Sequence, residues 1–307
     1  MSQRNSRTQM LYTLFFLFFL ICAFAAFFTG VKVGADKTEA KYEQQKSSNG
    51  YGLEEFTGSY QQKDLVTFYH NVFLPYREFK QNWNTQVDKL ARSTDARVNA
   101  AAMKNLSLLA DKQYERVNQD SIFSDSPLLH QSQLNILKSL TLFSKASGEI
   151  SASASGAETA KLLKNDPYTA GAVKFGLLAQ KNFYDSMLKW GSKTNQKIPS
   201  DAGELKTMSF IQWKKMPLLQ KNASIADMML NRGIFAAYDP QDITAKIDDL
   251  IHSGTASSLN LTDVQSSVTL LISTGAIQVE DFMKWREQYY SKETIPQLPF
   301  FMNRTSY

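Results

Sequence analysis

Residues 11–28 read LYTLFFLFFLICAFAAFF, and this stretch decides where the rest of the fold can lie. Its 18 residues include no charge, glycine or proline. A helix of that length rises ~27 Å, close to the ~30 Å hydrocarbon thickness of a bilayer. We therefore expect a transmembrane helix over residues 10–33. Its apolar contacts with lipid are expected from Leu11, Phe15, Phe16, Phe18, Phe19, Leu20, Ile21, Phe24, Phe27 and Phe28.

A buried helix of a water-soluble domain is the alternative interpretation of this run. Phenylalanines pointing in every direction would be hard to cover in a chain of 307 residues. Cys22 could also suggest a lipid-modified cysteine, but Leu20 and Ile21 are not the small residues that normally precede one. Cys22 is better explained as a small apolar residue of the helix.

The flanking charges predict the orientation of this helix. Arg4 and Arg7 precede it without any acid, whereas the residues that follow it carry both signs. The positive-inside rule then keeps residues 1–9 in the cytoplasm and exports the remainder of the chain. Small residues at Val33, Gly34 and Ala35 could be read by a signal peptidase, with cleavage after Ala35. The apolar run is longer than a usual signal-peptide core, which favours an uncleaved signal anchor.

Composition narrows the class of protein. The formal net charge is +5, from 34 basic and 29 acidic residues, but three of the basic residues are Arg4, Arg7 and Lys32. The exported part is therefore close to neutral, and its basic residues are not clustered, which argues against nucleic-acid binding. It also contains no cysteine. A large exported domain without disulfides is typical of a bacterial cell envelope rather than of an animal secreted protein.

The exported chain has the periodicity of an all-α domain. Residues 34–58 are polar, contain KSSNGYG, and are expected to form a flexible tether. Residues 59–293 are expected to form a helical domain, with a subdivision or long loop near residues 148–156. A helical stripe comprises Leu65, Phe68, Tyr69, Val72, Phe73, Tyr76, Phe79, Trp83, Val87 and Leu90. Such a stripe is more often core than a groove for glycan or lipid. Pro75 interrupts it and should kink or divide the helix.

Several local signals predict where later helices begin. Ser126-Pro127, Asp166-Pro167 and Asp239-Pro240 each pair a capping residue with a proline in the first helical turn. We also expect a helix over residues 202–216, and a capping box of Thr262 with Gln265.

No constellation of residues predicts catalysis, a cofactor or a metal. The three histidines are far apart and none belongs to a metal-ligand motif. The adjacent acids Asp248 and Asp249 point about 100° apart on a helix, and we interpret them as solvated. The sequence Tyr76-Arg77-Glu78, just after Pro75, is one point where a kink could expose polar groups beside aromatic ones.

The last segment, residues 294–307, reads TIPQLPFFMNRTSY. Pro296 and Pro299 disfavour a helix, so this tail should be extended. Its apolar residues Ile295, Leu298, Phe300 and Phe301 are expected either to dock on the helices near Trp285 or Tyr289, or to bind a partner.

These observations favour a single-pass, membrane-anchored helical protein of the cell envelope. The first hypothesis is a non-enzymatic binding, scaffold or assembly factor, whose partners are the lipid bilayer and another envelope or membrane protein. An envelope hydrolase that uses carboxylates in a helical cleft is the alternative, and two carboxylates in one deep cleft would favour it. An extracytoplasmic sensor is a third hypothesis, which would need a membrane partner.

Overall fold

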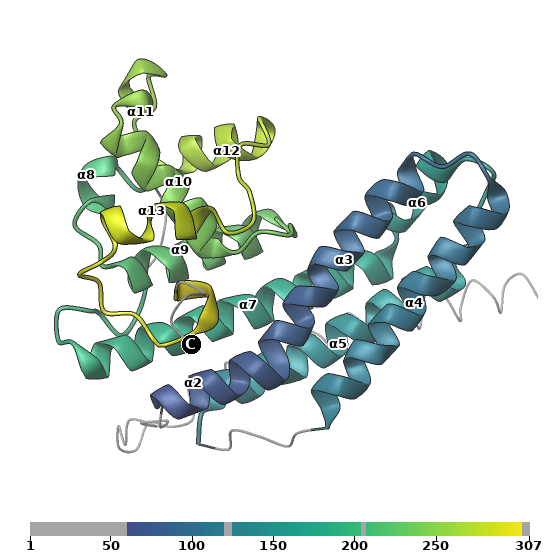
Figure 1. The fold of residues 1–307 in the computed structure, drawn as a ribbon, viewed down its shortest axis with the longest axis horizontal. Helices are drawn as coiled ribbons and strands as arrows, with labels where there is room; N and C mark the ends of the chain where they lie inside the picture. The colour runs from purple at the N-terminus through teal and green to yellow at the C-terminus, as the bar shows by residue number, and fades with distance from the viewer. Residues whose placement is uncertain (1–59, 120–124, 204–206, 303–307) are drawn as a thin grey trace, which may run out of the picture. The chain divides into compact units, whose positions relative to one another are not determined.

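The computed structural model describes residues 60–119, 125–203 and 207–302 (Figure 1). These residues form helices joined by turns and loops, with one isolated bridge between Ser209 and Asp263 and no strand, so the all-α class is confirmed for this part of the chain. The predicted anchor over residues 10–33 and the predicted tether over residues 34–58 lie outside the described residues. Within the three described ranges, no helix combines the length and the apolar character needed to cross a bilayer.

The first half of the domain is a bundle of long helices (Figure 1). It comprises α2 (Gln62–Phe68), the π-helical turn η1 (Tyr69–Phe73), α3 (Leu74–Ala91), α4 (Ala96–Asn118), α5 (Pro127–Glu149), α6 (Gly156–Asn165) and α7 (Pro167–Thr194). Helix α5 packs against α4 and α7, while α3 packs against α4 and α6. The predicted starts at Pro127 and Pro167 are confirmed, and the Asp166 carboxylate accepts from the N–H groups of Tyr168 and Thr169.

The predicted aromatic stripe forms the core of this bundle. All of its members except Val87, which is half-buried, are almost completely removed from solvent. Phe79 and Trp83 of α3 form a cluster of rings with Phe143 of α5, with centroids 4.3–5.6 Å apart. The interpretation of the stripe as core is therefore confirmed, because helical spacing places these rings on one face and the other helices cover it.

Residues 150–155 connect α5 with α6, within the segment where the sequence suggested a subdivision or a long loop. The N–H of Gly156 donates to the carbonyl of Ser93 at 2.9 Å. A Cβ at Gly156 would lie 1.9 Å from the Leu90 carbonyl oxygen. The glycine is therefore required by a close approach between two backbones.

The second half of the domain consists of shorter helices with their own apolar core. It contains α8 (Phe210–Trp213), α9 (Leu218–Arg232), α10 (Pro240–His252), α11 (Thr255–Ser258), α12 (Val264–Ser273), α13 (Asp281–Tyr289) and the 3-10 turn η2 (Pro299–Phe301). This core is formed by Leu177 of α7 together with Met208, Trp213, Ile225, Met228, Met229, Ile243, Ile247, Val264, Val268, Leu271 and Ile277. Helix α9 packs on α7 and so joins the two halves.

Two sequence-based expectations in this half are wrong. Among the described residues of 202–216 only Phe210–Trp213 is α-helical, because Gly203 adopts a left-handed φ of +77° and Ser209 caps a new helix. The capping box of Thr262 with Gln265 does not form either. Asp263 caps α12 by accepting from the N–H of Ser266, and the Gln265 side chain instead accepts from the N–H of Met208.

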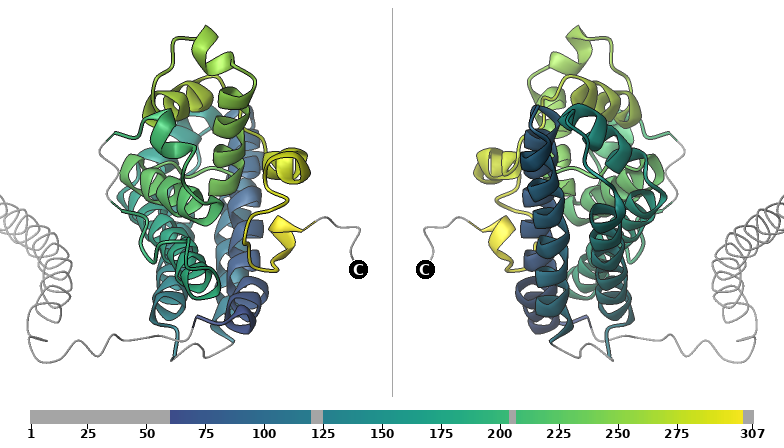
Figure 2. Two further views of the ribbon diagram at one scale, coloured as in Figure 1. Left: turned by 90° about the vertical axis from the view of Figure 1, so that its left-hand side faces the viewer. Right: turned by 90° about the vertical axis from the view of Figure 1, so that its right-hand side faces the viewer.

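The tail docks back on the domain, which is one of the two alternatives predicted for it. Leu298, Phe300 and Phe301 are buried and Ile295 is half-buried. Phe300 packs on Tyr69 and Phe301 on Phe282, whereas Trp285 and Tyr289 stack on each other. The segment runs beside the rod that α2, η1 and α3 form together (Figure 2). Gln62 and Gln297 exchange two hydrogen bonds there. Pro299 begins a single 3-10 turn, so the tail is not extended throughout.

Candidate functional site

A pocket of about 490 Å³ lies where η1, the start of α3, the starts of α10 and α13, and the C-terminal tail meet. Its lining is shared between four parts of the chain that are distant in sequence. The lining residues are Tyr69, His70, Leu74, Arg77, Gln241, Asp242, Glu280, Met283, Pro299, Phe300 and Met302. Its size is within the range of ~300–1,000 Å³ that is usual for small-molecule sites.

The π-helical turn η1 supplies one wall of this pocket. The N–H of Leu74 donates to the carbonyl of Tyr69, five residues earlier. Pro75 explains the widening, because a proline has no N–H and its ring clashes with the carbonyl four residues before it in a regular α-helix. Pro75 was predicted to kink or divide the helix, whereas α2, η1 and α3 follow one another without a break and a π-helical turn precedes the proline. The turn brings Tyr69 and His70 to the pocket, with Tyr69 buried and His70 exposed.

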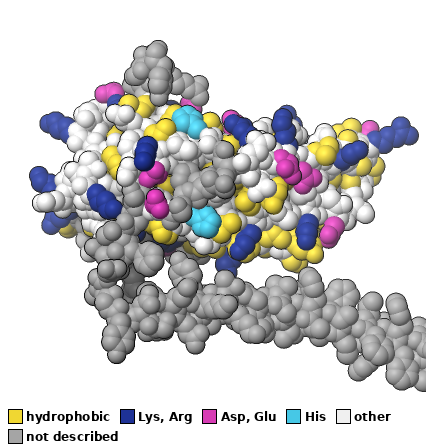
Figure 3. Space-filling view, turned by 90° about the horizontal axis from the view of Figure 1, so that it is seen from below, with side chains coloured by type: hydrophobic (Ala, Val, Ile, Leu, Met, Phe, Trp, Pro, Cys, Tyr) yellow, Lys and Arg dark blue, Asp and Glu magenta, His cyan; other side chains and the backbone are white. Residues whose placement is uncertain are grey.

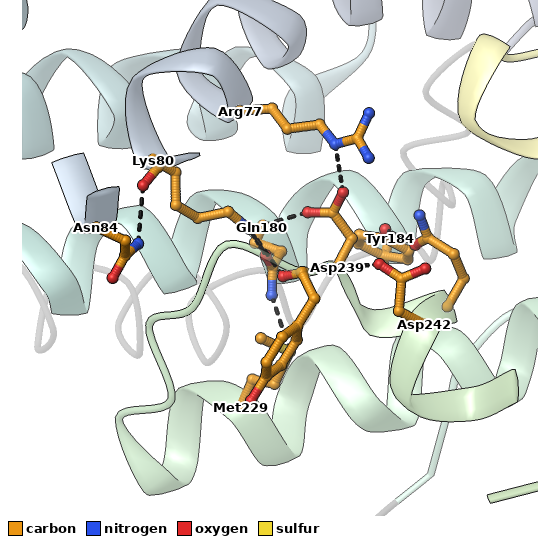
Figure 4. A network of polar contacts seen from close by, with 10 residues as sticks. Arg77, Lys80, Asn84, Gln180, Tyr184, Met229, Asp239 and Asp242 are labelled. Atoms are coloured by element: carbon orange, nitrogen blue, oxygen red, sulfur yellow. Dashed lines mark hydrogen bonds and ion pairs between the residues drawn. The ribbon is translucent and has the colours of Figure 1, made fainter. Parts of the chain in front are cut away.

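Beneath the pocket, Asp239 is completely buried between two cations of α3 (Figure 4). Its carboxylate lies 2.5 Å from Arg77 Nε and 2.9 Å from Lys80 Nζ. Burial raises the pKa of Asp239, but the charges of Lys80 and Arg77 outweigh that effect and hold its pKa below the usual value. The predicted cap at Asp239-Pro240 is thus also an ion-pair centre that fastens α10 to α3.

Asp242 is the buried acid of the pocket. Its Oδ2 accepts from the N–H of Asp239 at 3.0 Å, and its Oδ1 accepts from the N–H of Phe282 at 3.1 Å. The side chain therefore ties the first turn of α10 to the first turn of α13. Burial and the nearby charge of Asp239 raise the pKa of Asp242 to about 7.

Gln241 and Glu280 complete the polar part of the lining. Gln241 is buried, and its Oε1 accepts from the hydroxyl of Tyr184. Glu280 is exposed at the start of α13 with φ of +67°, a left-handed conformation that costs a non-glycine residue about 1–2 kcal/mol. Backbone strain of this kind is frequent near functional sites.

A second buried ion pair lies further along α10. Both oxygens of Asp248 are 2.9 Å from Lys221 Nζ of α9, and they also accept from Trp213 Nε1 of α8 and from Tyr290 Oη. Burial and the charge of Asp248 raise the pKa of Tyr290. The interpretation of Asp248 as a solvated acid is therefore wrong, since only 2% of the residue is exposed.

The structure brings together some of the residues that the sequence singled out. Phe300 forms part of the pocket wall, and Leu298 and Phe301 are buried behind it. Arg77, next to the predicted kink, contributes the cation. Asp242 and Gln241 were missed, although the spacing of Asp239 and Asp242 matches a capping box. All the predicted anchor residues lie outside the described ranges.

The residues that the structure describes contain no group of three or more His, Cys, Asp or Glu side chains placed to hold a metal ion. On the face drawn in Figure 3, basic and acidic side chains are interspersed instead of forming a patch of one sign.

Comparisons of the chain with protein-family models, with curated proteins and with solved structures find no match.

Proposed function

We propose that this protein is a single-pass, signal-anchored protein of the bacterial cell envelope, with its helical domain outside the cytoplasmic membrane. In this proposal the domain acts as a binding, scaffold or assembly factor, with the lipid bilayer and another envelope protein as its partners. The apolar run of residues 11–28 supports the anchor, and Arg4 with Arg7 supports the orientation.

One observation supports binding over catalysis. The buried acid of the pocket, Asp242, holds two backbone N–H groups, and the neighbouring Asp239 is neutralised by Arg77 and Lys80. These carboxylates are accounted for by their roles in the fold. Much of the remaining wall is apolar, from Leu74, Met283, Pro299, Phe300 and Met302. Pockets of this kind, with a few placed polar groups, are suited to binding.

Cysteine accessibility in intact cells tests the orientation directly. The chain has a single cysteine, Cys22, so a Cys22→Ser background allows single labels to be introduced. We expect Ser257→Cys, an exposed position at α11, to react with a membrane-impermeant maleimide. The matched variant Ser6→Cys, in the segment before the apolar run, should react only after the membrane is opened. Labelling of Ser6→Cys in intact cells, with Ser257→Cys protected, would reverse the orientation.

An envelope hydrolase is the second candidate, because Asp242 and Glu280 line the same pocket and the pKa of Asp242 is raised to about 7. A carboxyl group that is partly protonated at neutral pH is suited to general-acid catalysis. Incubation of the purified protein with isolated cell-wall polymer separates the two candidates. Polymer cleavage that is lost in Glu280→Gln would favour the hydrolase, whereas the binding role predicts no cleavage by either protein.

A further inference from the structure

Arg77 gives one end of the pocket a positive charge, and Asp239 pairs with only one nitrogen of its guanidinium. Arg77 donates to the Asp239 carboxylate through Nε, which leaves its two terminal nitrogens outside this hydrogen bond (Figure 4). Tyr69 lines the same pocket, and burial raises the pKa of its hydroxyl while the charge of Arg77 lowers it. Among the described residues, no second carboxylate forms an ion pair with Arg77. Because a guanidinium presents five N–H donors in a fixed fork, its outer edge can receive a carboxylate or phosphate group.

A second donor lies in the same lining. The Oε1 of Gln241 accepts from Tyr184, and no hydrogen bond from its amide Nε2 to another described residue is formed. Gln241 lines the pocket while being only 1% exposed. An amide donor in the same lining as a cation favours a ligand with acceptor oxygens.

The rest of the wall suits an apolar chain better than a peptide. The N–H groups of Met283 and Met302 already donate to the carbonyls of Glu280 and Pro299, and Pro299 has no N–H of its own. A bound peptide would bring a backbone N–H and C=O at every residue, each of which needs a partner when it is buried. The unbranched, adaptable side chains of Met283 and Met302 instead accommodate alkyl groups readily.

The two acids of the pocket do not prevent anion binding. Asp242 already accepts two backbone N–H groups, and its pKa of about 7 leaves it partly neutral at physiological pH. Glu280 is exposed, so water screens its charge. Beneath the pocket, Arg77 of the lining and Lys80 behind it together exceed the charge of Asp239 by one unit.

We propose that this pocket binds a small anionic amphiphile, with its carboxylate or phosphate on the outer nitrogens of Arg77 and its apolar chain along Met283, Phe300 and Met302. The proposal names a ligand class for the binding role above and rests on that role for its biological meaning. The titration below does not depend on the orientation of the chain in the membrane, so the two proposals can fail separately.

The test uses the full chain in lipid nanodiscs, labelled with ¹³C at the methionine methyl groups. Met283→Leu and Met302→Leu assign the two pocket signals. We expect hexanoate or hexyl phosphate to shift these signals, and the relative affinity of the two identifies the preferred head group. Hexanol and hexylammonium at the same concentration should leave both signals unchanged, although they partition into the lipid as well. Equal shifts with hexanol or hexylammonium would overturn the proposal.

A matched pair of variants tests the role of Arg77. Arg77→Lys keeps a cation for Asp239 but removes the outer edge of the guanidinium, so hexanoate should bind about tenfold more weakly. Arg116→Lys is the control, because Arg116 also pairs with a carboxylate, Glu78, but on the exposed surface. Equal affinity of Arg77→Lys and wild type would overturn the assignment. Acetyl-Leu-Phe with a free carboxylate is a further probe, and tighter binding of this peptide than of hexanoate would favour a peptide C-terminus and overturn the amphiphile.

Discussion

Each half of the domain is stabilised by a different kind of interaction. The bundle of α2–α7 is fastened mainly by apolar packing of long helices, with aromatic rings at its centre. In the second half, α10 and its N-cap carry three buried acids, and each ties the helix to other elements. Asp239 pairs with α3, Asp242 holds the start of α13, and Asp248 binds α8, α9 and Tyr290.

This difference explains where each half is vulnerable. An apolar contact that is lost costs roughly the transfer free energy of its side chain and a cavity term. A buried ion pair that loses one partner leaves an uncompensated charge, which costs ~3–5 kcal/mol. We therefore expect the second half to be more sensitive to single polar substitutions.

The largest effect is expected at Asp248. Replacing Asp248 with alanine leaves Lys221 buried without its carboxylate and removes the acceptor of Trp213 and Tyr290. We expect the free energy of unfolding to fall by ~3–5 kcal/mol. Urea unfolding of the chain from residue 59 onward measures this change. Asp249→Ala is the control, because this neighbouring acid is only half-buried, and a similar loss in both variants would contradict the argument.

Truncation of the tail tests a contact between the two halves. The tail joins Tyr69 of the rod to Phe282 of α13 through Phe300 and Phe301. Each large apolar side chain that loses its cover forfeits about 1.5–3 kcal/mol, partly offset by the regained freedom of the chain. Removal of residues 295–307 should therefore cost a net ~2–4 kcal/mol and lower the melting temperature by several degrees.

The truncated chain should also bind a dye that reports exposed apolar surface. Substitution of Ile211 by alanine is a control for apolar truncation elsewhere, since this side chain is 72% exposed. An unchanged melting temperature after truncation would show that the docked tail contributes no stability. The tail would then be better explained as a recognition segment.

Substitution of Gly156 tests whether the close approach of two backbones limits the stability of the bundle. Its Cβ in Gly156→Ala would meet the carbonyl oxygens of Leu90 and Ser93 at 1.9 and 2.7 Å, so two backbones must separate. We expect a loss of ~1–3 kcal/mol, as for other overpacked sites. At Gly148 the nearest atom to an added Cβ is Ser107 Oγ at 3.6 Å, an ordinary contact. Gly148→Ala should therefore be neutral or stabilising in the same urea experiment.

The same difference decides what could be predicted from the sequence. Helical spacing placed Leu65, Phe68 and Phe79 on one face, and Asp-Pro pairs located the starts of α7 and α10, because both signals are local. The helix expected over residues 202–216 was wrong because it was predicted from apolar spacing, which does not reveal the turn at Gly203. Asp248 has no local mark of burial, since its partners Lys221 and Tyr290 lie 27 and 42 positions away. The pocket was missed for the same reason, although the segment after Pro75 pointed to Arg77.

The smallest expected effect is the pH dependence that Asp242 imposes on the second half. Its pKa is 3.8 in an ordinary environment and about 7 in the folded protein. Between these values the folded state binds more protons than the unfolded state, so the contribution of Asp242 to stability falls as the pH rises from about 4 to about 7. Each pKa unit corresponds to ~1.4 kcal/mol, and partial relaxation around the charge reduces this, so we expect a loss of about 1–2 kcal/mol between pH 5 and 7.

Asp242→Asn isolates this contribution, because it cannot ionise yet retains an oxygen that can accept one of the two N–H groups. Its free energy of unfolding should decline less than that of wild type between pH 5 and 7, and the difference between the two curves should level off above the pKa of about 7. Asp111→Asn, at an exposed position of α4, serves as the control. Parallel curves for wild type and Asp242→Asn would mean that Asp242 is ionised throughout this range. The N–H groups of Asp239 and Phe282 would then stabilise its charge more than burial and Asp239 oppose it, and α10 would be held by three charged acids instead of two.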